Sequence, residues 1–94
     1  MSQMNELDAR QQLLVVTMEE CGELVQACSK ILRRQELYGD TKYIKNLKEE
    51  IGDVYCMIKL MQEWDVVSWE ELEERDKVKR AKLSKWSNLI SEKV

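Results

Sequence analysis

Two short acidic motifs of the same form lie thirty residues apart in this chain of 94 residues. Residues 19–23 read EECGE and residues 49–53 read EEIGD, so each motif contains two acids, a glycine and a further acid. Acids three positions apart on a helix are neighbours on one face. Each motif therefore predicts two adjacent carboxylates, an arrangement suited to a hard divalent cation. The first acid pair is Glu20 and Glu23, and the second acid pair is Glu50 and Asp53.

The chain around these motifs predicts long helices and no strand. It contains no proline and three glycines, and its apolar residues recur with the helical period. We expect three helices, near 5–36, 42–64 and 69–92. A length of 94 residues fits one domain, residues 1–94. The expected fold class is all-α, a bundle of long helices.

Turn and capping residues mark the boundaries between the helices. In the segment LYGDT, Gly39 can end the first helix, and Asp40 or Thr41 can cap the second. Ser68 and Glu71 have the S-x-x-E spacing of a capping box, which predicts the start of the third helix. A short connection between the first two helices favours antiparallel neighbours.

Helical periodicity places both acid pairs on apolar faces. At about 100° per residue, the first acid pair falls among the apolar residues of the first helix or at their edge. The second acid pair falls among the apolar residues of the second helix, so we expect all four acids to point inward. The apolar face of the first helix contains Leu13, Val16, Leu24, Ala27 and Ile31, and it continues through Leu14, Val25 and Cys28.

Four converging carboxylates without basic partners repel one another, and this repulsion raises their pKa values. A divalent cation removes the conflict, because Mg²⁺, or Mn²⁺ as the alternative, prefers oxygen ligands. Gly22 and Gly52 have a use in this arrangement, since a missing side chain lets a neighbouring helix or a ligand approach each pair. The alternative is that the acids are solvated, as most acids are. One pair alone would favour solvation, whereas two inward pairs with matched glycines favour a metal site.

The motifs EExxE at 19–23 and ExxD at 50–53 resemble the signature of the MazG-like nucleotide pyrophosphohydrolases, in the all-α NTP pyrophosphatase superfamily. The resemblance extends over roughly residues 13–86. It implies Mg²⁺ held by the two acid pairs and hydrolysis of a nucleoside triphosphate between its α and β phosphates, giving a monophosphate and pyrophosphate. A phosphoribosyl-ATP pyrophosphohydrolase is the alternative within the superfamily. The C-terminus argues against it, because the basic, proline-containing tail of that branch is missing.

The third expected helix carries cations that could contact phosphates. Lys79 falls within an apolar stripe, with Arg75 and Lys82 beside it, and the resemblance implies basic residues on this helix. An alternative explanation is that these cations complement the helix dipole and extend along apolar surface. Trp86 is the leading candidate for stacking on a nucleobase, with core or interface packing as its alternative.

The expected reaction is metal-assisted hydrolysis. Glu20 is the favoured carboxylate to orient or deprotonate the attacking water. Glu19 and Glu49 are candidates for a supporting role, and a solvated surface position is the alternative for each. Two other classes remain open: a helical module that binds a metal or nucleotide without cleaving it, and a purely structural bundle. Pyrophosphate release with and without Mg²⁺ separates the enzyme from the binding module.

Composition limits the partners. A net charge of −3 and a pI near 5.1 argue against a general nucleic-acid binder. No apolar run reaches the length of a membrane span and no export signal is visible, so we expect a cytoplasmic protein without a membrane partner. The three cysteines are expected to be buried, reduced thiols.

The apolar arc of the first helix is wider than one neighbouring helix can cover. This width predicts a homo-oligomer, with a tetramer favoured over a dimer.

Overall fold

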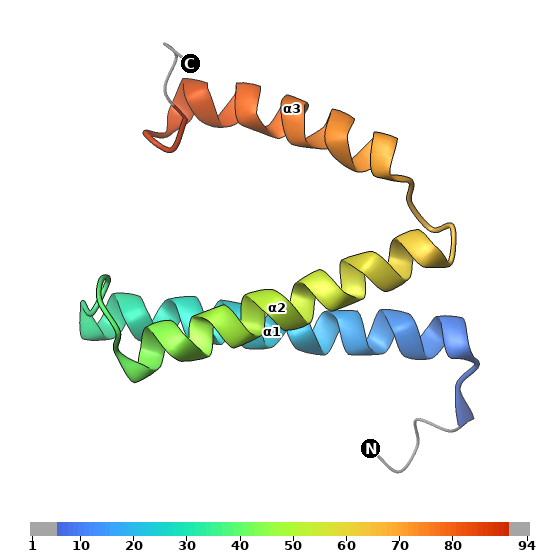
Figure 1. Cartoon of the computed structure of the whole chain (residues 1–94), viewed down its shortest axis with the longest axis horizontal. Coiled ribbons are helices and arrows are strands. Elements are labelled where there is room, and N and C mark those ends of the chain that lie inside the picture. The colour runs from blue at the N-terminus through green and yellow to red at the C-terminus, as the bar shows by residue number, and fades with distance from the viewer. Residues whose placement is uncertain (1–5, 91–94) are drawn as a thin grey trace. The chain divides into compact units, whose positions relative to one another are not determined.

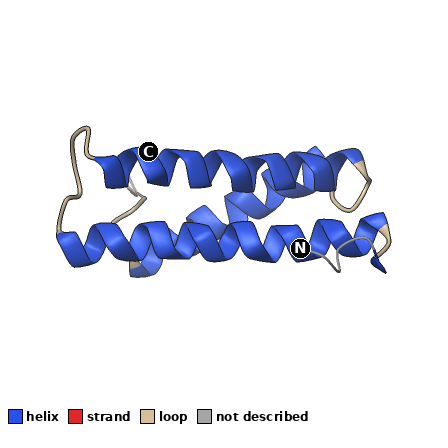
Figure 2. Ribbon diagram, turned by 90° about the horizontal axis from the view of Figure 1, so that it is seen from below, coloured by secondary structure: helices blue, strands red, loops and turns tan. Residues whose placement is uncertain are grey.

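The computed structural model describes residues 6–90, and these residues form three α helices and no strand. The helices are α1 (Ala9–Arg34), α2 (Lys42–Glu63) and α3 (Trp69–Trp86), joined by short loops (Figures 1 and 2). The prediction of an all-α fold is therefore confirmed. None of the three helices is long and apolar enough to cross a membrane.

Helix α1 begins at Ala9 because Asp8 caps it. The Asp8 carboxylate accepts a hydrogen bond from the Gln11 N–H at 2.7 Å, and the Gln11 side chain accepts one from the Asp8 N–H at 2.9 Å. This capping box satisfies N–H groups that a first turn leaves unpaired. The predicted start near residue 5 is too early, and residue 5 itself lies outside the described residues. The helix continues through Gly22 without a break.

The connection between α1 and α2 starts earlier than predicted. Gln35 adopts a left-handed conformation with φ 53° and ends α1 at Arg34, so the exit is at Gln35 and not at Gly39. Gly39 serves the turn itself, with φ +90°. Of the two predicted caps, Thr41 is the one used, because its hydroxyl accepts the Ile44 N–H at 3.1 Å. The chain then returns along α1, and α2 lies antiparallel to it (Figure 1).

Helix α3 has the predicted start and a shorter extent than predicted. Ser68 and Glu71 form the capping box, with hydrogen bonds of 2.9 and 3.1 Å. The helix ends at Trp86 because Ser87 is extended and its hydroxyl donates to the Leu83 carbonyl at 2.8 Å. Such a side-chain bond competes with continuation of the helix. The predicted end at residue 92 is therefore wrong, and residues 91–94 lie outside the described range.

The chain divides into two compact units, with the boundary between Met61 and Gln62. The first unit contains α1 and nearly all of α2, and the second contains α3. A single domain over residues 1–94 stays a prediction.

The buried core of the first unit is small. Its buried side chains come mainly from the predicted apolar face of α1, while Val16 and Leu24 on that face are half-buried. The outer part of the arc is exposed, including 67 % of Val25. The prediction of buried cysteines is wrong for the same reason: α1 and α2 each cover only part of the other, so the free thiols of Cys21, Cys28 and Cys56 are exposed. The buried residues are Leu13, Ala27, Ile31 and Met57.

Replacing Gly22 or Gly52 by alanine should stabilise the isolated chain by about 0.5–1 kcal/mol each, because glycine is the weaker helix former. A Cβ at either position would meet no atom within 4 Å, so no neighbouring helix of this chain needs the space. Urea unfolding at fixed pH measures the change. Gly39→Ala is the control and should destabilise, since φ +90° disfavours a side chain. Loss of stability in both helix variants would mean that another molecule packs against these glycines.

Candidate metal centre

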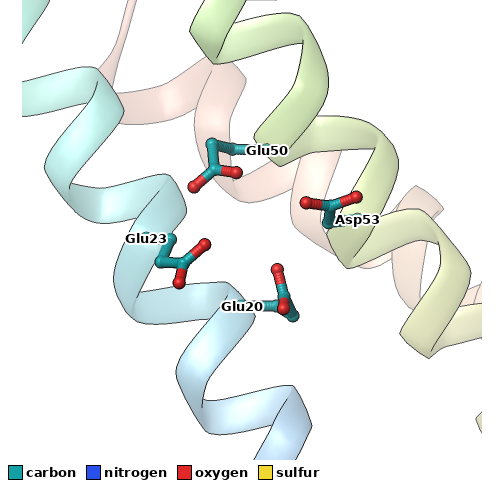
Figure 3. A group of neighbouring side chains, drawn as sticks. All are labelled: Glu20, Glu23, Glu50 and Asp53. Carbon is teal, nitrogen blue, oxygen red and sulfur yellow. The ribbon is translucent and has the colours of Figure 1, made fainter.

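The two acid pairs meet between α1 and α2. Helix α1 carries Glu20 and Glu23 one turn apart, and α2 carries Glu50 and Asp53 in the same way. Their side chains point toward one another from the two helices (Figure 3). One carboxylate oxygen from each of the four lies within 4.8 Å of the others. These four residues are called the acidic cluster below.

The acidic cluster has a sheltered side and an open side. Glu20 and Glu50 are half-buried, whereas Glu23 and Asp53 are exposed. The expectation that all four point inward is thus correct for the convergence of the side chains and wrong for the burial of two of them. Oxygen Oε2 of Glu20 is itself buried and has no hydrogen-bond partner in the described part of the chain. Leaving a buried polar atom without a partner costs free energy. A ligand that bound this oxygen would remove that cost.

Partial burial and crowded negative charge raise the pKa values of the two sheltered acids. Partial burial is the largest cause that raises the pKa of Glu20 above its ordinary value, and the charges of Glu23, Asp53 and Glu19 raise this pKa further. Partial burial also raises the pKa of Glu50, followed by a hydrogen bond with Glu23 that a protonated carboxyl can form. The surrounding carboxylates add to the shift of Glu50. Both shifts report a site where charge of one sign has no compensating charge.

No lysine or arginine of α1 or α2 forms an ion pair with the cluster. The ion pair that residues 6–90 do form joins Arg80 to Asp76 on α3, with an N–O distance of 3.0 Å. An all-oxygen donor set with unrelieved negative charge fits a hard divalent cation, and the unpartnered Glu20 oxygen supports the same conclusion. Soft thiol ligands are not part of the set, which favours Mg²⁺ or Mn²⁺ over zinc.

The supporting acids lie outside the acidic cluster. Glu19 is exposed on α1, yet its charge contributes to the raised pKa of Glu20, so it is close enough to act on that carboxyl electrostatically. Glu49 is exposed on α2. Surface positions agree with the solvated alternative for both residues, and a supporting role stays a prediction.

The cations and the aromatic residue predicted on α3 belong to the second unit, and all of them are exposed. The ammonium of Lys79 lies 5.7 Å from the centre of the Trp86 ring, so these two residues contact each other along α3. Arg75 borders a hollow whose other lining residues include Glu70, Glu71 and Glu74. Their contacts with a substrate stay predictions. The four residues are Arg75, Lys79, Lys82 and Trp86.

The first unit has a second charged feature, which lies outside both acidic motifs and was not predicted from the sequence. Lys30, Arg33 and Arg34 from α1 and Tyr43 from α2 line a hollow near the connecting loop, with a volume of about 600 Å³. The signal was present in the sequence as SKILRR followed by TKY. These two segments form a hollow only because they lie close together in space. The spacing of residues along one helix does not predict such a contact.

The comparison with protein families agrees with the geometry. The family model of the MazG nucleotide pyrophosphohydrolase domain matches residues 8–79. The chain belongs to this family. The matched residues include both acid pairs and end at Lys79, so Lys82 and Trp86 lie beyond the match. Neither the search of curated proteins nor the search of solved structures gave a match.

The metal-free MazG domain should lose stability as the pH rises from about 4.5 through the raised pKa values of Glu20 and Glu50. In this window the folded chain binds protons that the unfolded chain has released, so the stabilisation from these groups is present at lower pH and is lost at higher pH. Urea unfolding in EDTA at several pH values measures the slope.

The double variant Glu20→Gln/Glu50→Gln should remove this contribution, because neither side chain titrates. Glu63→Gln, on the same helix as Glu50 and exposed, is the matched control and should keep the wild-type slope. If the double variant and the wild type lost stability in parallel as the pH rises, the titration of Glu20 and Glu50 would not be the cause of that loss.

Proposed function

We propose that this MazG domain is a cytoplasmic, Mg²⁺-dependent nucleoside triphosphate pyrophosphohydrolase, which converts an NTP or dNTP to its monophosphate and pyrophosphate. The observation that carries the proposal is the acidic cluster, with four convergent carboxylates and a buried, unpartnered oxygen on Glu20. Membership of the MazG nucleotide pyrophosphohydrolase family supports it.

The ligands proposed for the cation are the four carboxylates of the acidic cluster, with Mn²⁺ as an alternative to Mg²⁺. When bound, such a cation neutralises phosphate charge and lowers the pKa of a coordinated water. The two helices contribute by holding the ligand oxygens close together before the cation arrives. Because both acid pairs lie on regular helix, the site needs no loop rearrangement to form.

Glu20 is the proposed base for the attacking water. Its oxygen Oε2 is buried and has no partner among the described residues, which supports a role in accepting the proton of a water. The water oxygen forms a bond to the α-phosphorus while the bond from that phosphorus to the bridging oxygen breaks. Pyrophosphate leaves with the bridging oxygen, and the proton of the water is held on the Glu20 carboxylate. The charge of Glu19 assists by keeping that proton on Glu20.

The proposed phosphate contacts on α3 are Lys79 and Lys82, with Arg75 behind them, and Trp86 is the proposed stacking surface for the base. Cations at these positions would stabilise the negative charge that develops on the leaving pyrophosphate. The contact between Lys79 and Trp86 supports a joint role, because it places a charge and an aromatic face side by side.

Asp53→Ala, or alanine at any other position of the acidic cluster, should reduce Mg²⁺-dependent pyrophosphate release by at least about 100-fold. Even outer partners of metal ligands cost up to about 100-fold when removed. The fold should be retained or stabilised, since one repelling charge is gone. Pyrophosphate release and urea unfolding measure the two effects, over a panel of NTPs and dNTPs.

Glu63→Ala, an exposed acid on α2 outside the cluster, is the matched control and should retain wild-type turnover. Wild-type activity in Asp53→Ala would show that the cluster is not the metal site. Binding of Mg²⁺ and nucleotide with no pyrophosphate release from any substrate would favour a binding module instead of an enzyme.

We further propose that the domain is a homo-oligomer, a tetramer of two dimers being favoured. An exposed apolar stripe along α1 supports association. Its members are spaced alternately four and three residues apart, which is the pattern of a helix that pairs with another helix. The large residues of the stripe are between 51 % and 68 % exposed. The stripe consists of Leu14, Met18, Cys21, Val25, Cys28 and Leu32.

The assembly should dissociate when a charge enters the exposed apolar stripe. Val25→Glu places a carboxylate in the centre of the stripe, where burial against a second copy would be costly. Light scattering at low micromolar concentration should show an oligomer for the wild type and a smaller species for Val25→Glu. Gln26→Glu adds the same charge on a neighbouring exposed position and should keep the oligomer. A wild type that is stable and active at monomer mass would exclude the assembly.

A further inference from the structure

The hollow at the loop end of the first unit is distinct from the acidic cluster. It is lined by Lys30, Arg33, Arg34 and Tyr43, and we name it the basic hollow. Its volume of about 600 Å³ lies within the range of about 300–1,000 Å³ that small-molecule sites have. All four lining residues belong to the first unit, so the basic hollow is formed by α1 and α2 alone.

The basic hollow concentrates positive charge in an acidic protein. Residues 29–48 contain six basic and two acidic residues, whereas the whole chain has a net charge of −3. No carboxylate lines the hollow, and none of its three cations forms an ion pair with any described residue. Like charges held together repel one another. An anion in the hollow would relieve this repulsion, as a cation would relieve that of the acidic cluster.

Tyr43 lines the basic hollow, and its aromatic ring contacts two cations. The guanidinium of Arg34 lies 5.0 Å from the centre of the half-buried Tyr43 ring, and the ammonium of Lys42 lies 5.3 Å from it. Contact with an aromatic face restricts a guanidinium without using its N–H donors. Arg34 can therefore still present its planar donors to an oxyanion, and guanidinium groups match phosphate geometry in a bidentate way.

The number of cations indicates the size of the anion. One phosphate group carries about −1.5 to −2 charges near pH 7, so three cations match a ligand with two linked phosphate groups better than one.

The position of the basic hollow relative to the acidic cluster also agrees with a phosphate-bearing ligand. Lys30 follows Glu23 by seven residues and Tyr43 precedes Glu50 by seven. Each step is two turns, roughly 10 Å along the helix, and returns to the same face.

We infer that the basic hollow is a binding site for a polyphosphate anion, meaning two or more phosphate groups joined by anhydride bonds. Two sources share this chemistry: the terminal phosphates of a nucleotide held at the acidic cluster, or a free anion such as pyrophosphate. Only the first source rests on the proposed function. Binding itself needs neither a metal nor catalysis.

Calorimetric titration of the metal-free protein with inorganic pyrophosphate, in EDTA at low ionic strength, tests the site. Without a cation the acidic cluster repels the probe, so binding reports a basic site. One pyrophosphate per chain should bind the wild type. Arg33→Gln/Arg34→Gln should weaken binding by at least about tenfold, because hydrogen bonds to charged groups are among the stronger ones. Lys30→Gln should give a smaller loss in the same direction.

Lys45→Gln/Lys48→Gln is the matched control. It removes two charges from the same basic segment, and both lysines are exposed and do not line the hollow. Its affinity for pyrophosphate should stay within about twofold of the wild type. Equal weakening in the two double variants would mean diffuse attraction and overturn the site, as would unchanged binding in Arg33→Gln/Arg34→Gln. Orthophosphate should bind more weakly, and equal affinity for it would overturn the polyphosphate class.

Steady-state kinetics with Mg²⁺ then identify the source. If the terminal phosphates of the substrate occupy the hollow, Arg33→Gln/Arg34→Gln raises KM for the nucleotide, and Lys45→Gln/Lys48→Gln leaves it unchanged. If a free anion occupies the hollow, neither double variant changes KM. An inactive wild type that still binds pyrophosphate in EDTA would reject the proposed function and keep the site.

Discussion

The mutual repulsion of four carboxylates is the interaction on which the rest of this domain depends. Partial burial and the close approach of the two acid pairs raise the pKa values of Glu20 and Glu50, and no cation of α1 or α2 forms an ion pair with them. A fold that keeps such a site gives up stability in the metal-free state. In the proposed function the same repulsion would favour binding of a hard cation, because a bound cation would relieve all four charges together. Lower stability of the metal-free chain and a preference for a hard cation would then both follow from one arrangement.

Local hydrogen bonds set the register that produces this arrangement. Asp8 fixes the start of α1, the left-handed Gln35 fixes its end, and Thr41 fixes the start of α2. With these boundaries fixed, the second acid pair lies opposite the first. The same register places the basic hollow two turns nearer the loop. The first unit thus carries a negative region and a positive region along one helix pair, an order that suits a ligand whose phosphates need both a metal and cations.

The small core explains why association is expected of this domain. Only four side chains of the described residues are buried, while the apolar stripe of α1 is exposed. A helix with apolar residues around most of its circumference needs more than one neighbour. Among the described residues, no atom lies within 4 Å of a Cβ added at Gly22 or Gly52, beside the acid pairs. The exposed stripe and these open positions both support the proposed association.

The sequence by itself determined the helical class, the two acid pairs and two of the caps, because each depends on residues within one or two turns. The capping box of Ser68 with Glu71 and the cap at Thr41, one of two candidates, belong to this group. The capping box of Asp8 with Gln11 is equally local, because residues 8–11, DARQ, have the capping-box spacing. Tertiary structure alone decided which apolar residues are covered, and this is why the cysteines are exposed against expectation. It also decided that one oxygen of Glu20 lacks a partner, and that Tyr43 meets cations of α1. Burial and charge crowding depend on how distant segments pack, whereas helix formation and capping are satisfied by neighbours in the chain.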